Sequence, residues 1–369
     1  MDGLEENNVD EFKRIAYWTN GRQQPEWQRE RGVELGIGDD AAVVALPASL
    51  NGLSGDAHMV LAVDTMVEHV HFSSITMADE DIGYKALACN VSDIAAMGAV
   101  PLHSLVAVSV PKSYNADRIR RLYDGIYACA DKYGVAVIGG DTTSAPAHLT
   151  ISVTVTGAVE AGRALKRSGA RPGDAVFVTG PIGMSAAGLH LLQHAGEAER
   201  SEYARLIAAH QRPAPSVRAG RLLLQRGTCT SLNDISDGLA SEVWEIAEAS
   251  GVRLMVDEQA LPKSGSMTAY AALAGVRPLD WMLYGGEDYV LTGTVAGEDA
   301  DEVREAFHRE GLPFYIIGQV EAGDPGVELL LSDAGSDRSG HSGGAKARGF
   351  GRTIPIEKRG YNHFSTVNG

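Results

Sequence analysis

Aspartates beside glycines recur at the predicted ends of strands and helices, and these residues have the chemistry to bind hard cations. They lie in four short motifs, Gly38-Asp39-Asp40, Val63-Asp64-Thr65, Gly139-Gly140-Asp141 and Asp234-Ile235-Ser236-Asp237. Carboxylate oxygens are the ligands that Mg²⁺ prefers, and neighbouring glycines let the backbone and a ligand approach closely. Because protein-bound Mg²⁺ commonly bridges to substrate phosphates, the pattern indicates phosphoryl chemistry.

Each of these motifs also has a purely structural interpretation. Asp side chains are common in turns because they bond to their own backbone, and Ser236 or Asp237 can simply cap the helix that follows. Asp93 favours the metal hypothesis, because it interrupts the apolar side of the helix expected at 81–97 and a buried acid needs a partner. A salt bridge to Lys85 or an exposed helix edge is the alternative for Asp93.

Three further patterns are less specific. The segment 180–188 (GPIGMSAAG) follows a predicted strand and opens a helix, but it matches neither GxGxxG nor GxxxxGK[ST], so a close-packed turn is the preferred interpretation. His69 and His71 would point the same way on one strand, but no third and fourth zinc ligand stands at a familiar spacing. The sequence therefore predicts no zinc site. The segment 285–289 (GGEDY) suits a ligand-facing loop and an ordinary turn equally well.

Composition and charge narrow the class of protein. The chain has 369 residues, of which 44% are apolar, and this length favours two domains with ordinary cores. A net charge of −16 without a basic stripe argues against a nucleic-acid partner. Cys89, Cys129 and Cys229 are isolated, which favours a reducing cytoplasm over a disulfide framework. No basic leader or long apolar run occurs, so we expect a cytoplasmic protein without a membrane segment.

The elements that would position these motifs alternate between strands and helices. In the first half we expect strands at 59–64 and 68–72 joined by a tight turn, a helix at 81–97, a strand at 102–110, a helix from Asn115 to Gly134, and strands at 135–138 and 149–159. Asn115 is a good N-cap and Gly134 a good helix stop. The last strand alternates apolar and polar residues, so a partner subunit could cover its polar face.

The glycine-rich, positively charged segment 161–174 breaks this pattern and predicts a domain boundary near residue 160. Beyond it we expect strands at 175–179, 253–257, 288–295 and 313–317, and helices at 184–193, 217–225, 238–249 and 301–309. Glycine, serine and charge dominate at 332–352, where we expect a flexible loop. The final segment, 353–369, is expected to fold back on the body.

Six ordered motifs together resemble those of the thiamine-monophosphate kinases. They are GIGDDAA at 36–42, VDT at 63–65 with His71-Phe72, NVSDIAAMGA at 90–99, GGDTT at 139–143, DISDGL at 234–239 and GGEDY at 285–289. The resemblance spans roughly residues 10–320 and the final aromatic segment, and six motifs in one order are far more specific than any of them alone. That family belongs to the aminoimidazole-ribonucleotide-synthetase-like (PurM-like) superfamily of ATP-using enzymes.

The resemblance implies an α/β (α+β) fold of two domains. The N-terminal PurM-like domain, 1–160, would bind metal and substrate, and its mixed sheet would pair across a homodimer. The C-terminal α/β domain, 161–331, would close over the nucleotide and the substrate. The loop 332–352 looks like an addition to the family pattern.

The resemblance also implies roles for individual residues. Several Mg²⁺ ions would be held by Asp40, Asp64, Asp93, Asp141, Asp234 and Asp237. ATP would be contacted by Gly140, Asp141, Arg167 and Ser236, and thiamine monophosphate by His71, Glu287 and Tyr361. Asp64 and Asp141 would carry the catalytic metal chemistry.

The chain departs from the family pattern at several positions. Ala62 and Val63 stand where Ser or Thr is common, so a metal contact there would have to come from backbone oxygen. His69 replaces a usual glycine, and Tyr361 stands where the family often has Trp. These departures concern local geometry more than the reaction.

The implied reaction is Mg²⁺-dependent in-line transfer of the γ-phosphate of ATP to thiamine monophosphate, which gives thiamine diphosphate and ADP. The alternatives are another ATP-using enzyme of the superfamily, such as a synthetase, a selenide-phosphorylating enzyme or a hydrogenase-maturation factor, and a metal-dependent phosphohydrolase. A non-enzymatic module stabilised by Mg²⁺ or Ca²⁺ is the remaining alternative.

Overall fold

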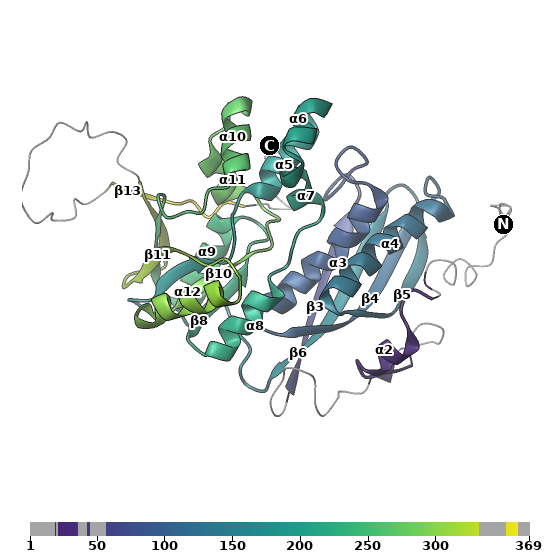
Figure 1. Cartoon of the computed structure of the whole chain (residues 1–369), viewed down its shortest axis with the longest axis horizontal. Coiled ribbons are helices and arrows are strands. Elements are labelled where there is room, and N and C mark those ends of the chain that lie inside the picture. The colour runs from purple at the N-terminus through teal and green to yellow at the C-terminus, as the bar shows by residue number, and fades with distance from the viewer. Residues whose placement is uncertain (1–18, 20, 36–42, 45–56, 332–351, 361–369) are drawn as a thin grey trace, which may run out of the picture. The chain divides into compact units, whose positions relative to one another are not determined.

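The computed structural model describes residues 19, 21–35, 43–44, 57–331 and 352–360. The chain divides into two compact units (Figure 1). The first unit comprises Met1–Ala164 and Ala187–Leu224, and the second comprises Leu165–Ala186 and Gln225–Gly369. Both units combine helices with a sheet, so the predicted α/β class is confirmed.

The first unit is built on a four-stranded sheet whose order is β3-β6-β4-β5. Its strands are β3 (Ala57–Val67), β4 (Val100–Pro111), β5 (Ala136–Ala145) and β6 (Thr150–Glu160). Only the β4–β5 pair is parallel among these strands. Helices α3 (Asp79–Ala96) and α4 (Ala116–Tyr133) lie side by side against one face of this sheet (Figure 1).

The limits of α4 follow from its capping residues, as predicted. The Asn115 side chain accepts a hydrogen bond from the Arg118 backbone N–H at 2.9 Å, and Gly134 adopts the left-handed conformation at φ 72°. The two helices also approach closely, because a Cβ at Gly83 would lie 1.8 Å from the Leu122 carbonyl oxygen. Close packing of α3 on α4 fixes the helix that carries Asp93.

Two predicted elements of the first unit are wrong in extent. Residues 68–72 form a turn closed by an isolated bridge between Glu68 and Phe72, not a strand. Strand β5 does not stop at Ile138, because Gly139, Gly140 and the residues after them stay paired with β4. The glycine-aspartate motif therefore lies inside a strand.

The rest of the first unit consists of short N-terminal elements and a group of helices. They are α2 (Pro25–Arg29), β1 (Val33–Leu35), β2 (Val43–Val44), α6 (Glu197–Glu202) and α7 (Ala204–Gln211). Helix α5 (Met184–His194) begins in the second unit and ends in the first, and α8 (Val217–Arg226) begins in the first unit and ends in the second. The Arg221 guanidinium forms a buried ion pair with Glu160, at 2.8 and 2.9 Å to the two carboxylate oxygens. This pair joins α8 to the end of β6.

The second unit is built on a seven-stranded sheet of order β13-β12-β9-β11-β7-β10-β8. Its strands are β7 (Ala175–Val178), β8 (Cys229–Asp234), β9 (Arg253–Asp257), β10 (Leu291–Val295), β11 (Tyr315–Glu321), β12 (Gly326–Leu330) and β13 (Thr353–Pro355). Its helices are α9 (Leu239–Ser250), α10 (Gly265–Ala274), α11 (Pro278–Tyr284) and α12 (Ala300–Arg309), with the 3₁₀ turn η1 (Gly297–Asp299). The pattern analysis missed β8, β12, α10 and α11. Strand β13 pairs with β12, so the final segment joins this sheet where it is described.

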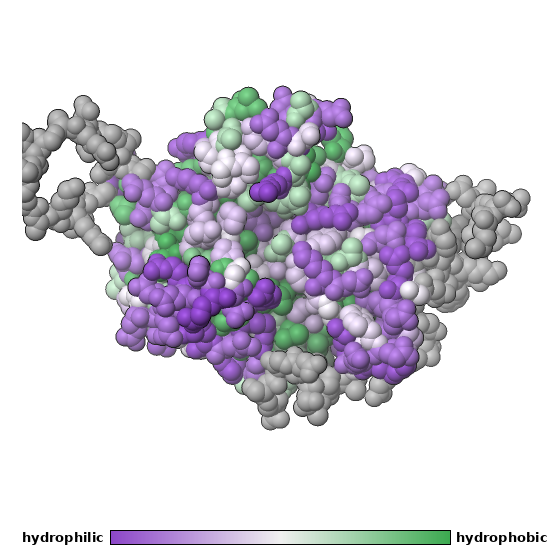
Figure 2. All heavy atoms as spheres, viewed as in Figure 1, coloured by the Kyte–Doolittle hydropathy of each residue, from purple (hydrophilic) through white to green (hydrophobic). Residues whose placement is uncertain are grey.

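The amphipathic helices turn their polar sides to water, which makes the surface over them hydrophilic. In α12, Val303 and Phe307 are fully buried while the charged residues face water. The faces over α4 and α12 that Figure 2 shows are mostly hydrophilic. In the described part of the chain, no helix is long and apolar enough to cross a membrane.

Candidate active site

The first unit brings two of the predicted metal ligands together. Asp64 lies on β3 and Asp93 on α3, and their side chains share a hydrogen bond. Loss of surrounding water raises the pKa of Asp64, and the hydrogen bond from Asp93 offsets part of that rise. A hydrogen bond between two carboxyl groups requires a shared proton, and a divalent cation can take its place. Paired carboxylate oxygens suit Mg²⁺, so these residues fit the metal that the sequence predicts.

The strand register places Asp64 on the helix-covered side of the sheet. Asp64 pairs with Val153, which is fully buried, and Gly157 of the same strand face lies against Ile94 of α3. Thr65 lies on the opposite face, where its hydroxyl contacts that of Ser152 at 2.7 Å. The carboxylate of Asp64 is thus directed to α3 by the pleat of β3.

Asp141 lies elsewhere in the same unit. It pairs with Ala107, which in turn pairs with Ser152, so Asp141 belongs to the face opposite Asp64. Strands β3 and β5 are also separated by β6 and β4, and three strand spacings span roughly 14 Å. Within one copy of the chain, the structure therefore does not bring Asp141 to the Asp64–Asp93 pair. Gly140 beside it is required for packing, because a Cβ there would lie 1.8 Å from the Val106 carbonyl oxygen.

The second unit gathers the other predicted acids around a buried glutamate. Glu242, on α9, accepts hydrogen bonds from the Ser236 hydroxyl at 3.3 Å and the Asp237 backbone N–H at 3.1 Å. Burial raises the pKa of Glu242 to about 8, and the charges of Asp234 and Glu245 contribute to that rise. Ser236 and Asp237, the last two residues of the motif, thus lie beside one protonatable carboxyl group.

Arg167 lies in the same network. Its guanidinium donates to the Asn233 side-chain oxygen at 3.1 Å and pairs with Glu245 at 3.0 Å. The Asn233 amide donates in turn to Glu242 and to Glu245. The predicted ATP contacts Arg167 and Ser236 are therefore connected through side chains of β8 and α9.

The GGEDY segment lies against the Asp234–Asp237 motif. The Glu287 backbone N–H donates to the Ser236 carbonyl oxygen at 2.7 Å, and the Tyr289 N–H donates to that of Ile235 at 2.9 Å. A Cβ at Gly286 would lie 2.5 Å from the same Ser236 oxygen, which explains the glycine. Glu287 itself has φ 67°, a conformation that non-glycine residues adopt rarely and mostly at constrained sites. This favours a functional loop over an ordinary turn.

The neighbouring Asp288 accounts for the turn at 180–188. Its half-buried carboxylate accepts hydrogen bonds from the backbone N–H groups of Gly183 and Ser185, at the start of α5. Burial raises the pKa of Asp288 to about 7, against the opposing effect of those hydrogen bonds. An acidic side chain of the protein thus occupies this helix N-terminus, a position that suits a phosphate, and this agrees with the close-packed turn expected there.

The predicted substrate residue His71 is oriented by the backbone of its own turn. Its Nδ1 accepts a hydrogen bond from the Val67 N–H at 2.9 Å. Because a backbone N–H only donates, Nδ1 carries no proton and Nε2 of the neutral ring carries it. His71 can therefore present an N–H donor to an anion. Asp40 and Tyr361 lie outside the described residues.

Sequence patterns missed the residues that support the second-unit cluster. Asn233 precedes the Asp234–Asp237 motif, and Glu242 and Glu245 follow it on α9. Glu242 occupies a buried helix position, 2% exposed, and a polar residue at such a position is the same signal that identified Asp93.

Comparisons with known proteins identify the family of the chain. Residues 38–159 match the N-terminal domain, and residues 171–329 the C-terminal domain, of the AIR synthase related proteins. The thiamine-monophosphate kinase of Bacillus subtilis (strain 168) is 40% identical over 362 residues, which cover 96% of this chain and 100% of that protein.

Solved structures show the same relationship. The crystal structure of thiamine-monophosphate kinase from Stenotrophomonas maltophilia K279a has a TM-score of 0.72 and 35% identity, covering 82% of this chain and 94% of that one. AaThiL complexed with AMPPCP and TMP has a TM-score of 0.66 and 32% identity, covering 73% of this chain and 83% of that one. The chain therefore belongs to the thiamine-monophosphate kinase family, within the AIR synthase related proteins.

Proposed function

We propose that this chain transfers the γ-phosphate of ATP to thiamine monophosphate, giving thiamine diphosphate and ADP. The carrying observation is the Asp64–Asp93 carboxyl pair, found in a chain that aligns with a thiamine-monophosphate kinase over that protein's full length. The structure of AaThiL complexed with AMPPCP and TMP supports the same pair of substrates.

The acceptor supplies its own nucleophile. A phosphate monoester has its second pKa near ~6, so its oxygen is already mostly anionic at neutral pH. No side chain has to remove a proton, and the protein's contribution is positioning and electrostatic stabilisation. This accounts for a site built from acids and donors without a His-Asp or Ser-His catalytic pair.

We propose that Asp64 and Asp93 hold Mg²⁺, with Asp40, Asp141, Asp234 and Asp237 as the further ligands. Bound Mg²⁺ supplies screening between the two phosphate groups and stabilises charge on the transferred phosphoryl. The chain's own donors would contact the substrates, Arg167 and Ser236 the ATP and the Nε2–H of His71 the acceptor phosphate. Glu287 would balance the positive thiazolium, and Tyr361 would stack on it.

We also propose a homodimer that buries the outer face of the first-unit sheet. Leu61 and Val63 are each 64% exposed on this face, and Leu105, across β6 on the same face, is 41% exposed. Exposed apolar residues grouped on one sheet face mark an interaction surface. If β3 of one copy met β5 of the other, the partner strand that carries Asp141 would lie beside the strand that carries Asp64, which the single copy does not achieve. The domain division near residue 160 and a cytoplasmic location remain part of the proposal.

One assay tests the reaction. Purified protein is incubated with Mg-ATP and thiamine monophosphate, and phosphorus NMR follows the products. A diphosphate ester that grows in step with ADP supports the kinase. Inorganic phosphate alone would instead identify a phosphohydrolase, and no turnover with metal-dependent melting would identify a binding module.

A further inference from the structure

The turn after β3 carries a second cluster of metal-binding groups, separate in composition from the aspartate pair. Glu68, His69 and His148 offer a carboxylate oxygen and two imidazole nitrogens that all lie within 4.8 Å of one another. The two imidazole rings stand edge to face with centroids 5.2 Å apart. His148 comes from the loop before β6, so 79 positions along the chain separate the two histidines.

We propose that these three residues bind a divalent transition-metal ion of the zinc type. Two imidazoles and one carboxylate form a ligand set that suits Zn²⁺, with water in the fourth position, whereas Mg²⁺ and Ca²⁺ prefer oxygen ligands throughout. Zinc bonds of ~2.0–2.1 Å place tetrahedral ligand atoms roughly 3.4 Å apart. Both histidines are exposed, so rotation of their side chains closes the remaining difference.

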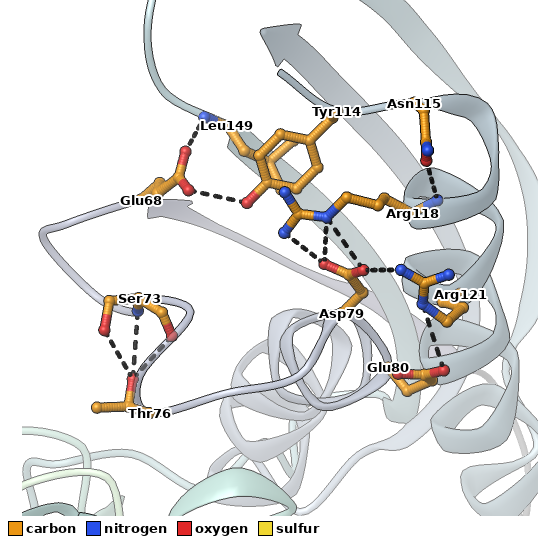
Figure 3. A network of polar contacts seen from close by, with 10 residues as sticks. All are labelled: Glu68, Ser73, Thr76, Asp79, Glu80, Tyr114, Asn115, Arg118, Arg121 and Leu149. Atoms are coloured by element: carbon orange, nitrogen blue, oxygen red, sulfur yellow. Dashed lines mark hydrogen bonds and ion pairs between the residues drawn. The ribbon is translucent and has the colours of Figure 1, made fainter. Parts of the chain in front are cut away.

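The carboxylate of Glu68 is already held in place. One oxygen accepts a hydrogen bond from the Tyr114 hydroxyl at 2.9 Å and the other from the Leu149 N–H at 3.0 Å (Figure 3). Each carboxylate oxygen has a second lone pair for a metal. Metal-binding carboxylates are characteristically hydrogen bonded in this way, because the outer partners fix the ligand's orientation.

The support extends beyond Tyr114. The Arg118 guanidinium lies 3.7 Å from the centroid of the Tyr114 ring and donates to Asp79 at 2.8 Å, and Arg121 donates to Asp79 at 2.7 Å (Figure 3). The Tyr114 hydroxyl is the donor in its bond to Glu68, because a carboxylate oxygen only accepts. The ligand that anchors the cluster is thus part of a stiff network.

The backbone fixes both histidines relative to Glu68. The Glu68 N–H donates to the Leu149 carbonyl oxygen at 2.9 Å, which ties the residue after His148 to this turn. His69 has φ 65°, and its N–H donates to the Phe72 carbonyl oxygen at 2.7 Å. A glycine would adopt this conformation at lower cost, so the histidine stands here against local backbone preference.

A bound ion would connect the turn 68–72 to the loop before β6. His71 lies in that turn, so the metal would also restrain the residue that we assign to the acceptor phosphate. Binding by Glu68, His69 and His148 does not depend on the proposed kinase activity, because all three ligands belong to the first unit and none is an assigned substrate contact.

The test is calorimetric titration of the full chain with ZnCl₂ in excess MgCl₂, without ATP or thiamine monophosphate. Wild type should show one binding event per chain, and both His69→Gly and His148→Ala should weaken it at least tenfold. His69→Gly suits the left-handed backbone and His148 is exposed, so both variants should fold normally. His308→Ala, which removes an exposed histidine of α12, is the matched control and should bind zinc as wild type does.

Thermal melting provides the second readout. Zinc should raise the Tm of wild type and of His308→Ala by a few degrees, but not that of His148→Ala, because an ion that binds only the folded state stabilises it. Retention of the zinc event in both ligand variants would overturn the proposal. The same holds for a wild-type chain with no zinc event, in which case the two histidines only pack edge to face. Kinase turnover is measured separately, so its failure would leave this result unaffected.

Discussion

The acids of the two units have different electrostatic surroundings. In the first unit, Asp64 faces Asp93, and loss of water raises the pKa of Asp64. In the second unit, Glu242 lies among acids too, but the Asn233 amide and the Arg167 guanidinium stand between the carboxylates there. Donors and a positive charge already balance part of the second cluster. The first pair therefore depends more on an added cation, and the second more on its own hydrogen bonds.

Asp64→Asn tests the first half of this comparison and should have the largest effect. We expect kcat to fall by about a hundredfold or more, because an amide is a poor ligand for Mg²⁺ and transition-state charge loses its stabilisation. Steady-state ADP release with thiamine monophosphate measures it. Asp301→Asn on the exposed side of α12 is the control and should be neutral.

The companion variant Tyr361→Ala should mainly raise the KM for the acceptor, since stacking contributes to binding more than to phosphoryl transfer. If kcat fell equally in Asp64→Asn and Tyr361→Ala, the division between metal binding and substrate binding would be wrong.

Leu61→Asp asks whether the first-unit site is complete in one copy. A charge on the exposed apolar face should convert the dimer to monomer and lower activity about tenfold or more, because the strand that carries Asp141 would no longer lie beside the Asp64 strand of another copy. Sedimentation and activity are measured on the same samples. Ile75→Asp is the matched control, since Ile75 is also exposed, at 70%, but lies in the turn before α3. A monomer with full activity would contradict the shared site.

Glu242→Ala probes the second cluster through stability. The Ser236 hydroxyl and the Asp237 N–H would lose this acceptor, and the Asn233 amide would lose one of its two acceptors, so the free energy of unfolding should fall by about 1–3 kcal/mol. Urea unfolding at pH 7 measures it, with Glu302→Ala, an exposed acid paired with Arg226, as the control. Unchanged stability would show that the hydrogen bonds to Glu242 do not hold Ser236 and Asp237 in place.

Asp288→Asn gives the smallest and most pH-dependent effect. The folded-state pKa of about 7 lies above the ordinary value of 3.8, so the protonated Asp288 adds stability that is complete below about pH 4 and is lost as pH rises through 7. The stability difference between wild type and Asp288→Asn should therefore shift by roughly 1–3 kcal/mol between pH 5 and pH 8. Parallel unfolding curves across this range would disprove the assignment.

Local signals predicted much of the fold. The limits of α4 follow from Asn115 and Gly134, because caps act within one turn of the chain. Strands such as β6 follow from alternation. The predicted strand at 68–72 failed because its residues alternate in polarity but His69 takes a left-handed conformation that closes a turn. Helices α10 and α11 were missed because their sequences, GSMTAYAALA and PLDWMLY, show no clear alternation between an apolar and a polar helix face.

The candidate site, too, was predicted in part from the sequence. Its residue types and their order indicated carboxylate-bound metal and phosphoryl transfer, and the family followed from six motifs in one order. Which side of a strand each acid occupies depends on pairing register, so the sequence alone does not predict that Asp64 and Asp141 lie on opposite faces. It likewise does not predict that His69 and His148 lie close together.

The sequence by itself determined the chemistry that this protein can perform, because the residue types alone specify the metal-binding side chains, their charge and their glycine neighbours. Only the tertiary structure decided which donors meet. Pairing of distant strands and the packing of α3 on the sheet bring side chains within bonding distance at long sequence separations, and these interactions depend on the whole fold rather than on any local segment.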